Sequence, residues 1–216
     1  LSRANVIRKV RREARPTRLL TAAFTPTATP VVARRLSIRD VTGRATGSGG
    51  MGLVSALALE PGFYELRVAT ELSGGATGSV HTFVEVPDFK RELLSMSGVL
   101  LHVVPEEPAA PREEIDDVLP FVPTAQRTFN RGDVMSAFVQ ISQGTERRDR
   151  LQSVTVRLRI IDARDAAVRD QSLALEPAAF AKNRTANSKL MVPTAGLVPG
   201  RYLLRLSTAM GERHVE

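Results

Sequence analysis

The feature that most constrains the fold is a phrase that occurs twice. Leu59 to Arg67 reads LEPGFYELR and Leu197 to Arg205 reads LVPGRYLLR, so both copies follow the pattern L-x-P-G-x-Y-x-L-R. The two copies contain the only tyrosines of the 216-residue chain, Tyr64 and Tyr202. A second pair of phrases, RLSIRDVTGR and RLRIIDARDA, precedes them in the same order. The repeat therefore predicts two related domains of one fold.

The repeated phrase is typical of a turn between consecutive strands. Pro and Gly make the turn, and the tyrosine then enters the next strand with its ring buried and its hydroxyl folded back to the backbone of that turn. This tyrosine corner is typical of immunoglobulin-like and fibronectin-like sandwiches. The leucine would be the last core residue before the turn. The residues assigned to the two corners are Leu59, Pro61, Gly62 and Tyr64, and Leu197, Pro199, Gly200 and Tyr202.

The rest of the chain fits a β fold. Short apolar runs alternate with Gly- and Pro-containing turns, and no stretch between residues 19 and 86 has a sustained 3.6-residue stripe. The runs expected to be strands are LLTAAF, VVARRLSI, LVSALALE, FYELRVATEL and GSVHTFVEV, then DVMSAFVQIS, SVTVRLRIID, AVRDQSLALE, KLMVP and GRYLLRLST. The predicted fold class is all-β, with two tandem immunoglobulin/fibronectin-III-like β-sandwiches.

Composition divides the chain into four parts. Residues 105–126, PEEPAAPREEIDDVLPFVPTAQ, contain five prolines and six acids, and such a proline density blocks helix interiors and central strands. This segment is expected to be an acidic linker or surface loop; it lacks the spacing of an EF-hand calcium loop. The predicted division is a basic arm or junction to a missing upstream domain over 1–18, one sandwich over 19–104, the linker over 105–126, and a second sandwich over 127–216 that is truncated before its last strand.

The positive charge is concentrated at the start of the chain. Of the formal net charge of +7, a balance of +6 comes from seven bases and one acid in the first 18 residues, so the remainder is close to neutral. A basic arm of this kind could bind nucleic acid or an anionic surface, or pair with the acidic segment. The residues of this possible anion-binding arm are Arg3, Arg8, Lys9, Arg11, Arg12, Arg15 and Arg18.

Several classes of site find no support in the sequence. There is no cysteine, which excludes disulfides, thiol nucleophiles and cysteine-bound zinc, and the three histidines have no metal-ligand spacing. No phosphate loop and no nucleophile elbow is present. Tryptophan is absent and tyrosine is rare, which disfavours carbohydrate platforms and single-strand nucleic-acid binding. Arg131-Gly132-Asp133 is interpreted as a turn before a strand. We expect no catalytic, cofactor-binding or metal residues.

Several longer phrases resemble a known family. PGFYELRVATELSGGATGSVHTFVEVPDF, FVPTAQRTFNRGDVMSAFVQISQG and VTVRLRIIDARDAAVRDQSLALE with LMVPTAGLVPGRYLLRLS are similar to the C-terminal β-sandwich region of bacterial (acidobacterial-type) VWFA-related domain proteins. The resemblance covers roughly residues 53–216. It implies a secreted or envelope protein whose A domain lies upstream. The Asp-x-Ser-x-Ser metal loop of an A domain is missing, so no metal residue is carried over.

The expected function is therefore non-enzymatic: a structural or protein-interaction module of an extracytoplasmic protein. Its partner would be a protein, either its own upstream domain or another envelope protein, and no membrane span is expected. One alternative is binding of nucleic acid or an anionic surface through residues 1–18. A third is an accessory sandwich of a polymer-degrading enzyme, which the shortage of aromatic residues disfavours.

Overall fold

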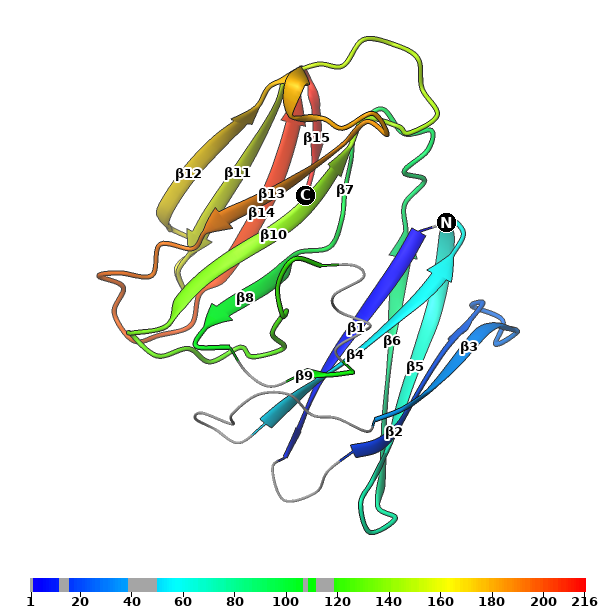
Figure 1. The fold of residues 1–216 in the computed structure, drawn as a ribbon. Helices are drawn as coiled ribbons and strands as arrows, with labels where there is room; N and C mark the ends of the chain where they lie inside the picture. Colours follow the sequence, from blue (N-terminus) through cyan, green and yellow to red (C-terminus); the bar gives the residue numbers. More distant parts are fainter. Residues whose placement is uncertain (1, 12–15, 39–49, 107–108, 112–118) are drawn as a thin grey trace. The chain divides into compact units, whose positions relative to one another are not determined.

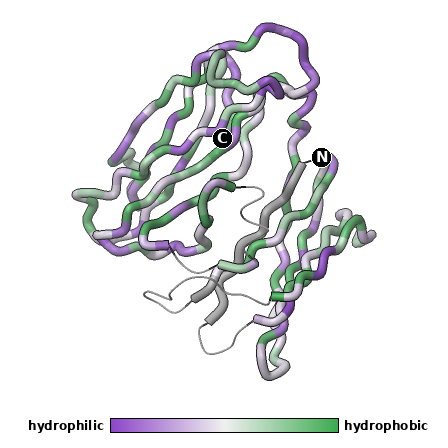
Figure 2. Tube along the Cα trace, in the orientation of Figure 1, coloured by the Kyte–Doolittle hydropathy of each residue, from purple (hydrophilic) through white to green (hydrophobic). Residues whose placement is uncertain are grey.

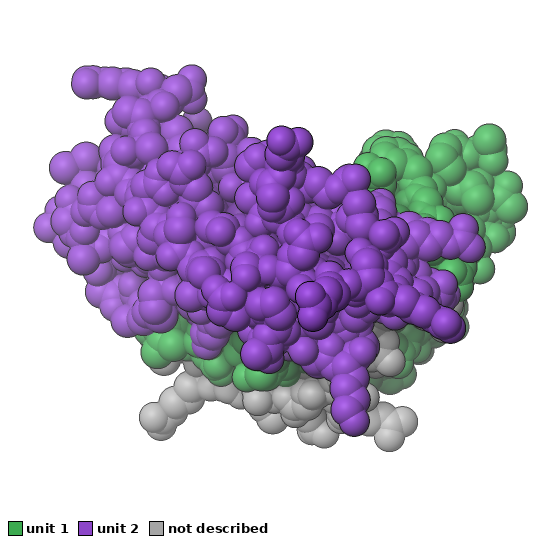
Figure 3. Space-filling model, turned by 90° about the horizontal axis from the view of Figure 1, so that it is seen from above, with its two compact units in different colours: residues 1–87, 102–129 green, residues 88–101, 130–216 purple. Residues whose placement is uncertain are grey.

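The computed structural model describes residues 2–11, 16–38, 50–106, 109–111 and 119–216. The chain forms two compact units (Figures 1 and 3). Unit 1 comprises residues 1–87 and 102–129, and unit 2 comprises residues 88–101 and 130–216. Each unit holds one copy of the repeated phrase. The predicted all-β class is confirmed, because the described residues form strands apart from turns and one short 3-10 helix, η1 (Pro177–Ala179).

Unit 1 contains two sheets. The first is antiparallel, has the order β3-β2-β5-β6, and consists of β2 (Pro16–Phe24), β3 (Pro30–Ser37), β5 (Gly62–Leu72) and β6 (Thr77–Val86). The second has the order β1-β4-β9 and consists of β1 (Ser2–Arg11), β4 (Gly50–Leu59) and the short β9 (Ala109–Ala110), which runs parallel to β4.

The two sheets of unit 1 pack face to face, because their side chains share the same core. Along β5, Tyr64, Leu66 and Val68 are buried while the residues between them are more exposed, as a half-buried strand requires. Two clusters take members from both sheets: Leu19, Ile38, Leu53, Val68 and Ala110 in one, and Ala23, Leu57, Leu59, Tyr64, Leu66 and Val86 in the other. Unit 1 is therefore a β-sandwich.

Unit 2 also contains two sheets. One has the order β13-β10-β7 and consists of β7 (Ser95–Met96), β10 (Val134–Ser142) and β13 (Thr185–Met191), with β8 (Leu100–Val104) also paired to β10. The other has the order β12-β11-β14-β15 and consists of β11 (Val154–Ile161), β12 (Ala167–Leu175), β14 (Leu203–Met210) and β15 (Arg213–Val215).

Local sequence explains the strands of unit 2 well. On β11, Val154, Val156, Leu158 and Ile160 are at most 3% exposed, and they alternate with more exposed polar residues (hydropathy along the chain in Figure 2). Asp162 then ends the strand, because its Oδ1 accepts hydrogen bonds from the backbone N–H groups of Arg164 at 2.8 Å and Ala166 at 3.0 Å. This is the Asp-and-turn signal of the earlier repeated phrase.

The division of the chain differs from the predicted one at its N-terminus. The separate arm over 1–18 is not found: Ser2–Arg11 is β1, paired residue by residue with β4, and residues 16–18 begin β2. β1 lies at the edge of its sheet. Charged side chains are common on edge strands, where they discourage pairing with other chains. A basic composition is thus compatible with a strand.

The second difference concerns the predicted linker and the segment before it. Residues 102–129 belong to unit 1, and Ala110, Leu119, Phe121 and Val122 are each no more than 8% exposed. The apolar residues between the prolines anchor this segment, which sequence composition had indicated to be solvated. Residues 88–101, assigned by prediction to the first sandwich, belong instead to unit 2. The reason is that Ser95 and Met96 of β7 pair with Ser142 and Ile141 of β10.

Candidate interaction surfaces

The two tyrosines of the repeated phrase occupy equivalent positions after their turns. The Tyr64 hydroxyl donates a hydrogen bond to the Glu60 carbonyl oxygen at 3.0 Å, and the Tyr202 hydroxyl donates one to the Val198 carbonyl oxygen at 2.8 Å. This is the geometry of a tyrosine corner. In the first copy, a side chain on Gly62, whose φ is +153°, would meet the Tyr64 ring edge and hydroxyl at 3.3–3.5 Å. Glycine is therefore favoured there.

The two corners differ in burial. In unit 1, Leu59 is 1% exposed and Tyr64 9% exposed, and both belong to the core. In unit 2, Leu197 and Tyr202 are half-buried, and Pro199 and Gly200 are exposed, as Pro61 and Gly62 are in unit 1. Both hydroxyls are satisfied by backbone, so these residues serve the fold and leave no free group for chemistry.

A surface with a different character covers the outer side of the sheet β3-β2-β5-β6. We call it the aromatic face and define it by Leu20, Phe24, Phe63, Arg67 and Phe83, with Glu65 between them. The register places Glu65 of β5 opposite Phe24 of β2 on one side and opposite Phe83 of β6 on the other. Since side chains alternate along a strand, these residues project away from the core that Tyr64 enters.

The aromatic face exposes large apolar side chains around one ion pair. Phe63 is 52% exposed and Phe83 57% exposed, and their rings stack with centroids 6.2 Å apart and planes 15° apart. Arg67 donates to Glu65 through Nε and Nη2, both at 2.9 Å, while its guanidinium lies 4.3 Å from the centre of the Phe24 ring. The Arg67 hydrogen bond lowers the pKa of Glu65, so the carboxylate stays charged.

Exposed phenylalanines beside an arginine are the residue types that anchor protein–protein contacts. The phenylalanines are divided between core and surface: Phe63 and Phe83 are exposed, while Phe121, Phe138 and Phe180 are buried. The sequence held the signal that would have shown this. With Tyr64 assigned to the core, its neighbour Phe63 must face the opposite side of the strand.

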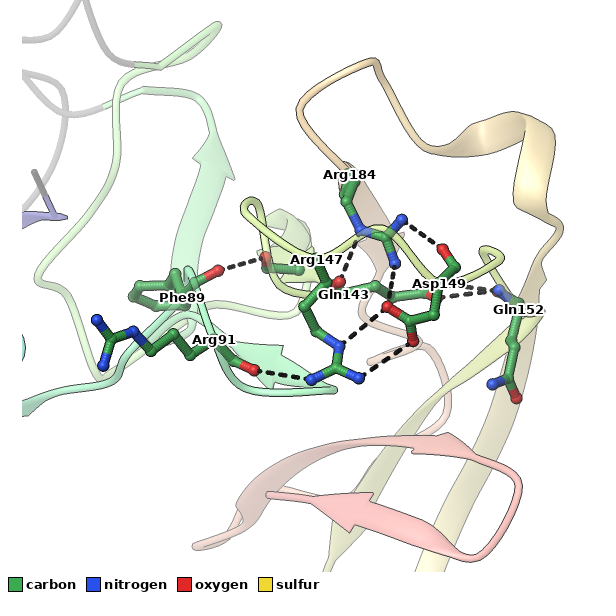
Figure 4. A network of polar contacts seen from close by, with 8 residues as sticks. Phe89, Arg91, Gln143, Arg147, Asp149, Gln152 and Arg184 are labelled. Carbon is green, nitrogen blue, oxygen red and sulfur yellow. Dashed lines mark hydrogen bonds and ion pairs between the residues drawn. The ribbon is translucent and has the colours of Figure 1, made fainter.

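Unit 2 carries a second notable feature, a loop cluster formed by residues 88–92, 143–152 and 184 (Figure 4). The Asp149 carboxylate lies at its centre. Arg147 Nε donates to Asp149 Oδ1 at 3.0 Å, and Arg184 donates to the Asp149 carbonyl oxygen at 2.7 Å and to the Gln143 carbonyl oxygen at 2.9 Å. The Arg147 hydrogen bond is the largest cause of a lowered pKa at Asp149.

Buried amide groups and backbone pairing hold the same loops in place. Gln143 is 2% exposed, and its side chain donates to the Gln152 carbonyl oxygen at 2.7 Å and accepts from the Gln152 N–H at 2.9 Å. The Phe89 carbonyl oxygen accepts from the Thr145 N–H at 3.0 Å and from the Ser142 hydroxyl at 3.1 Å. Every charged group at the centre of the cluster has a partner within it. The cluster therefore orders the loops at one end of unit 2.

The remaining predicted residues are placed as follows. Arg3, Arg8, Lys9 and Arg11 lie on β1, Arg12 and Arg15 are outside the described residues, and Arg18 on β2 forms an ion pair with Glu71 at 3.0 Å. The Arg131-Gly132-Asp133 turn is closed by Asp133, whose carboxylate accepts from the Asn130 N–H at 2.7 Å. Among the residues that the structure describes, no three His, Asp or Glu side chains form a group suited to a metal ion.

Comparison with protein-family models, with curated proteins and with solved structures finds no match for this chain. The described part of the chain has no helix that is both long and apolar enough to span a membrane.

Proposed function

We propose that this chain is a non-catalytic module that acts by binding protein, within a secreted or envelope protein of the VWFA-related kind. The observation that carries the proposal is the aromatic face. Its exposed phenylalanines and the Glu65–Arg67 pair offer apolar area, a planar guanidinium and a neutral charge balance. Such a surface suits the centre of a protein interface, in which aromatic residues and Arg are enriched.

The rigidity of this surface supports the same function. The aromatic residues stand on strands whose opposite faces fill the core of unit 1, so binding does not require ordering of a loop. Loop ordering is one of the costs of association, and a surface carried by paired strands avoids it. The extracytoplasmic setting and the family assignment rest on the sequence phrases that resemble the VWFA-related proteins.

Binding through residues 1–18, the alternative considered from sequence, gains no specific support. The backbone of residues 2–11 is engaged with β4 along its whole length, so this segment is not a free arm that could follow a polyanion. No second function is therefore proposed.

The test compares surface variants in a capture experiment. Wild-type chain, Phe63→Ser and the matched control Val198→Ser would be immobilised and exposed to an envelope extract of the organism that encodes the chain. Val198 is 71% exposed and belongs to unit 2, so it is not a residue of the aromatic face. We expect wild type and Val198→Ser to retain one protein from the extract that Phe63→Ser does not retain. After purification, that protein should again bind to wild type.

Two results would contradict the proposal. One is a captured protein that Phe63→Ser retains as well as wild type does, since the aromatic face would then contribute nothing to binding. The other is a confirmed turnover of any substrate by the purified chain, since the module would then be catalytic.

A further inference from the structure

The edge strand β6 lacks the features that usually keep β edges apart. It has 10 residues, and its register with β5 runs without a shift from Gly62↔Val86 to Glu71↔Thr77. Among the described residues it pairs with β5 alone, so one side of its backbone presents unpaired N–H and C=O groups. A long regular edge of this kind is a template for a further strand.

The other sheet edges of the described chain are protected. β7, β9 and β15 are two or three residues long, and β8 has five. β3 begins with Pro30 and contains two arginines, and β12 contains Arg169 and Asp170; both also border a register irregularity. β13 contains Lys189, and β1 contains three arginines and a lysine. Only β6 combines length, regular pairing and a sequence without Pro, Lys or Arg, TGSVHTFVEV.

Side chains on both faces of β6 are left exposed. Phe83 projects to the aromatic face and is 57% exposed, while Val80, opposite Val68 on the core side, is 42% exposed. An additional strand beside β6 would cover both of them. The exposure therefore coincides with the unpaired backbone, which is the pattern expected of a strand that receives a partner strand.

We propose that β6 pairs antiparallel with β6 of a second copy of this chain, joining the two four-stranded sheets into one continuous sheet. The inference rests on the proposed function, because it names one partner of the binding module. A second copy fits because the edge is nearly free of charge: Glu85 is the only acidic residue in it. Two such edges approach without the like-charge repulsion that two opposed β1 strands, each with four basic residues, would meet.

The side chains also select a register. A two-fold axis perpendicular to the sheet keeps matching faces together only when residues on the same face oppose each other. With the axis at Thr82, Val80 opposes Val84 and Phe83 opposes His81 of the second copy, each twice, and Glu85 opposes Ser79. With the axis at His81, the two histidines oppose each other and Val80 meets Thr82. The first register gives the better packed pairs, because aromatic and β-branched pairs stabilise a ladder.

A single introduced cysteine tests this register directly. The chain has no cysteine, so any disulfide in Thr82→Cys joins two copies. Directly opposed residues of an antiparallel pair have Cα atoms about 4.5–5.5 Å apart, within the range of about 4.4–6.8 Å that a disulfide spans. Under mild oxidation we expect Thr82→Cys to become a covalent dimer. Ser172→Cys, an exposed position on the edge strand β12, is the matched control and should remain largely monomeric.

Self-association of the unmodified chain is the second measurement. Sedimentation velocity of wild type should show a concentration-dependent dimer, and Thr82→Lys should weaken it roughly tenfold because two lysines oppose each other. Ser172→Lys should leave it unchanged, and circular dichroism confirms that each variant is folded. A wild type that is monomeric at its highest soluble concentration, or cross-linking of Thr82→Cys no faster than that of Ser172→Cys, overturns the inference.

The outcome is separable from that of the proposed function. If Thr82→Cys fails to cross-link while Phe63→Ser still loses its captured partner, the dimer is wrong and the binding module stands. If the purified chain turns over a substrate, the proposed function fails, whereas a specific cross-link at Thr82 would still establish the dimer.

Discussion

The Tyr64 hydroxyl reaches back four residues to the Glu60 carbonyl oxygen, and Tyr202 does the same to Val198. In both copies the hydrogen bond spans the Pro-Gly turn. The strand that follows the turn, β5 in unit 1 and β14 in unit 2, pairs with another central strand of its sheet. A hydroxyl bonded across a turn fixes the direction in which the next strand leaves. The two bonds therefore explain why a chain poor in tyrosine places both tyrosines in the same phrase.

The first prediction separates the hydrogen bond of the corner from its packing. Tyr64→Phe loses one part-buried hydrogen bond and should lower the free energy of unfolding by about 1 kcal/mol. Tyr64→Ala also leaves a cavity in the core of unit 1 and should cost about 3–5 kcal/mol. Tyr202→Phe should have a modest effect and Tyr202→Ala a larger one, though smaller than Tyr64→Ala because Tyr202 is only half-buried.

In these variants circular dichroism follows the unit that carries the substitution, and tyrosine fluorescence follows the other unit as an internal control. The chain has no tryptophan, and its tyrosines lie one in each unit, so Tyr64→Phe leaves Tyr202 to report on unit 2 and Tyr202→Phe leaves Tyr64 to report on unit 1. Chemical denaturation monitored by circular dichroism gives the free energies of the substituted units. An unchanged unfolding midpoint for Tyr202→Ala would show that the second corner has no structural role.

The second prediction concerns Gly144 in the loop cluster. Its φ is +66°, and an added Cβ would lie 2.6 Å from Arg147 Cδ and 2.8 Å from the Glu92 carbonyl oxygen. Gly144→Ala should cost about 2 kcal/mol or more, from a left-handed backbone and a contact with backbone that cannot move aside. Gly132→Ala is the control, because a Cβ there meets nothing within 4 Å. Equal thermal unfolding midpoints for the two variants would refute this account of the loop.

The third prediction is a pH dependence arising from Asp149. The Arg147 hydrogen bond lowers its pKa in the folded chain, so the carboxylate stabilises the fold above the ordinary Asp pKa of about 3.9. This contribution is lost as the pH falls through the lower, folded pKa. Asp149→Asn should therefore be less stable than wild type near neutral pH, and the difference should shrink in acid.

Urea unfolding between neutral and acidic pH measures this difference. Because the Asp149 side chain is 40% exposed, the effect should be small and should decrease with added salt. Asp165→Asn is the matched control, since no ion pair is found for Asp165 within unit 2. A stability difference for Asp149→Asn that is constant with pH would mean that its charge is not what matters.

The fourth prediction is a gain in stability. Thr208 on β14 is 1% exposed, and its hydroxyl has no hydrogen-bond partner among the described residues. Thr208→Val keeps the shape and removes the buried hydroxyl, so it should stabilise the chain by about 1 kcal/mol. Thr155→Val, at an exposed position of the neighbouring β11, should change stability little. Thermal unfolding compares the two, and a destabilised Thr208→Val would show that the hydroxyl is satisfied in solution.

The strands could be predicted because their signals are local. Alternation along residues 63–72 and 154–161, the Pro-Gly turns and the Asp162 turn all act within a few residues. The unit boundaries could not be predicted, because they depend on pairing between distant segments, such as β7 with β10. Composition also misled at residues 105–126, where the proline content concealed the buried Leu119, Phe121 and Val122.

The two candidate surfaces also differ in how far they could be predicted from the sequence. The outward direction of Phe63 follows from the inward direction of Tyr64, so part of the aromatic face could be predicted from the sequence. Its completion by Phe24 and Phe83 depends on which strands lie beside β5. The loop cluster could not be predicted from the sequence, because Arg184 contacts Asp149 across 35 residues of sequence and no local pattern links the two.

The alternation of chain segments between the two units limits how the gene of such a protein can be divided in evolution. The polypeptide enters unit 2 at residue 88, returns to unit 1 at residue 102 and re-enters unit 2 at residue 130. No single cut of the coding sequence separates the two units cleanly. A cut before residue 88 removes residues 102–129 from unit 1, and a cut after residue 129 removes residues 88–101 from unit 2. Despite their shared phrase, the two units cannot be divided by a single recombination point into two intact pieces.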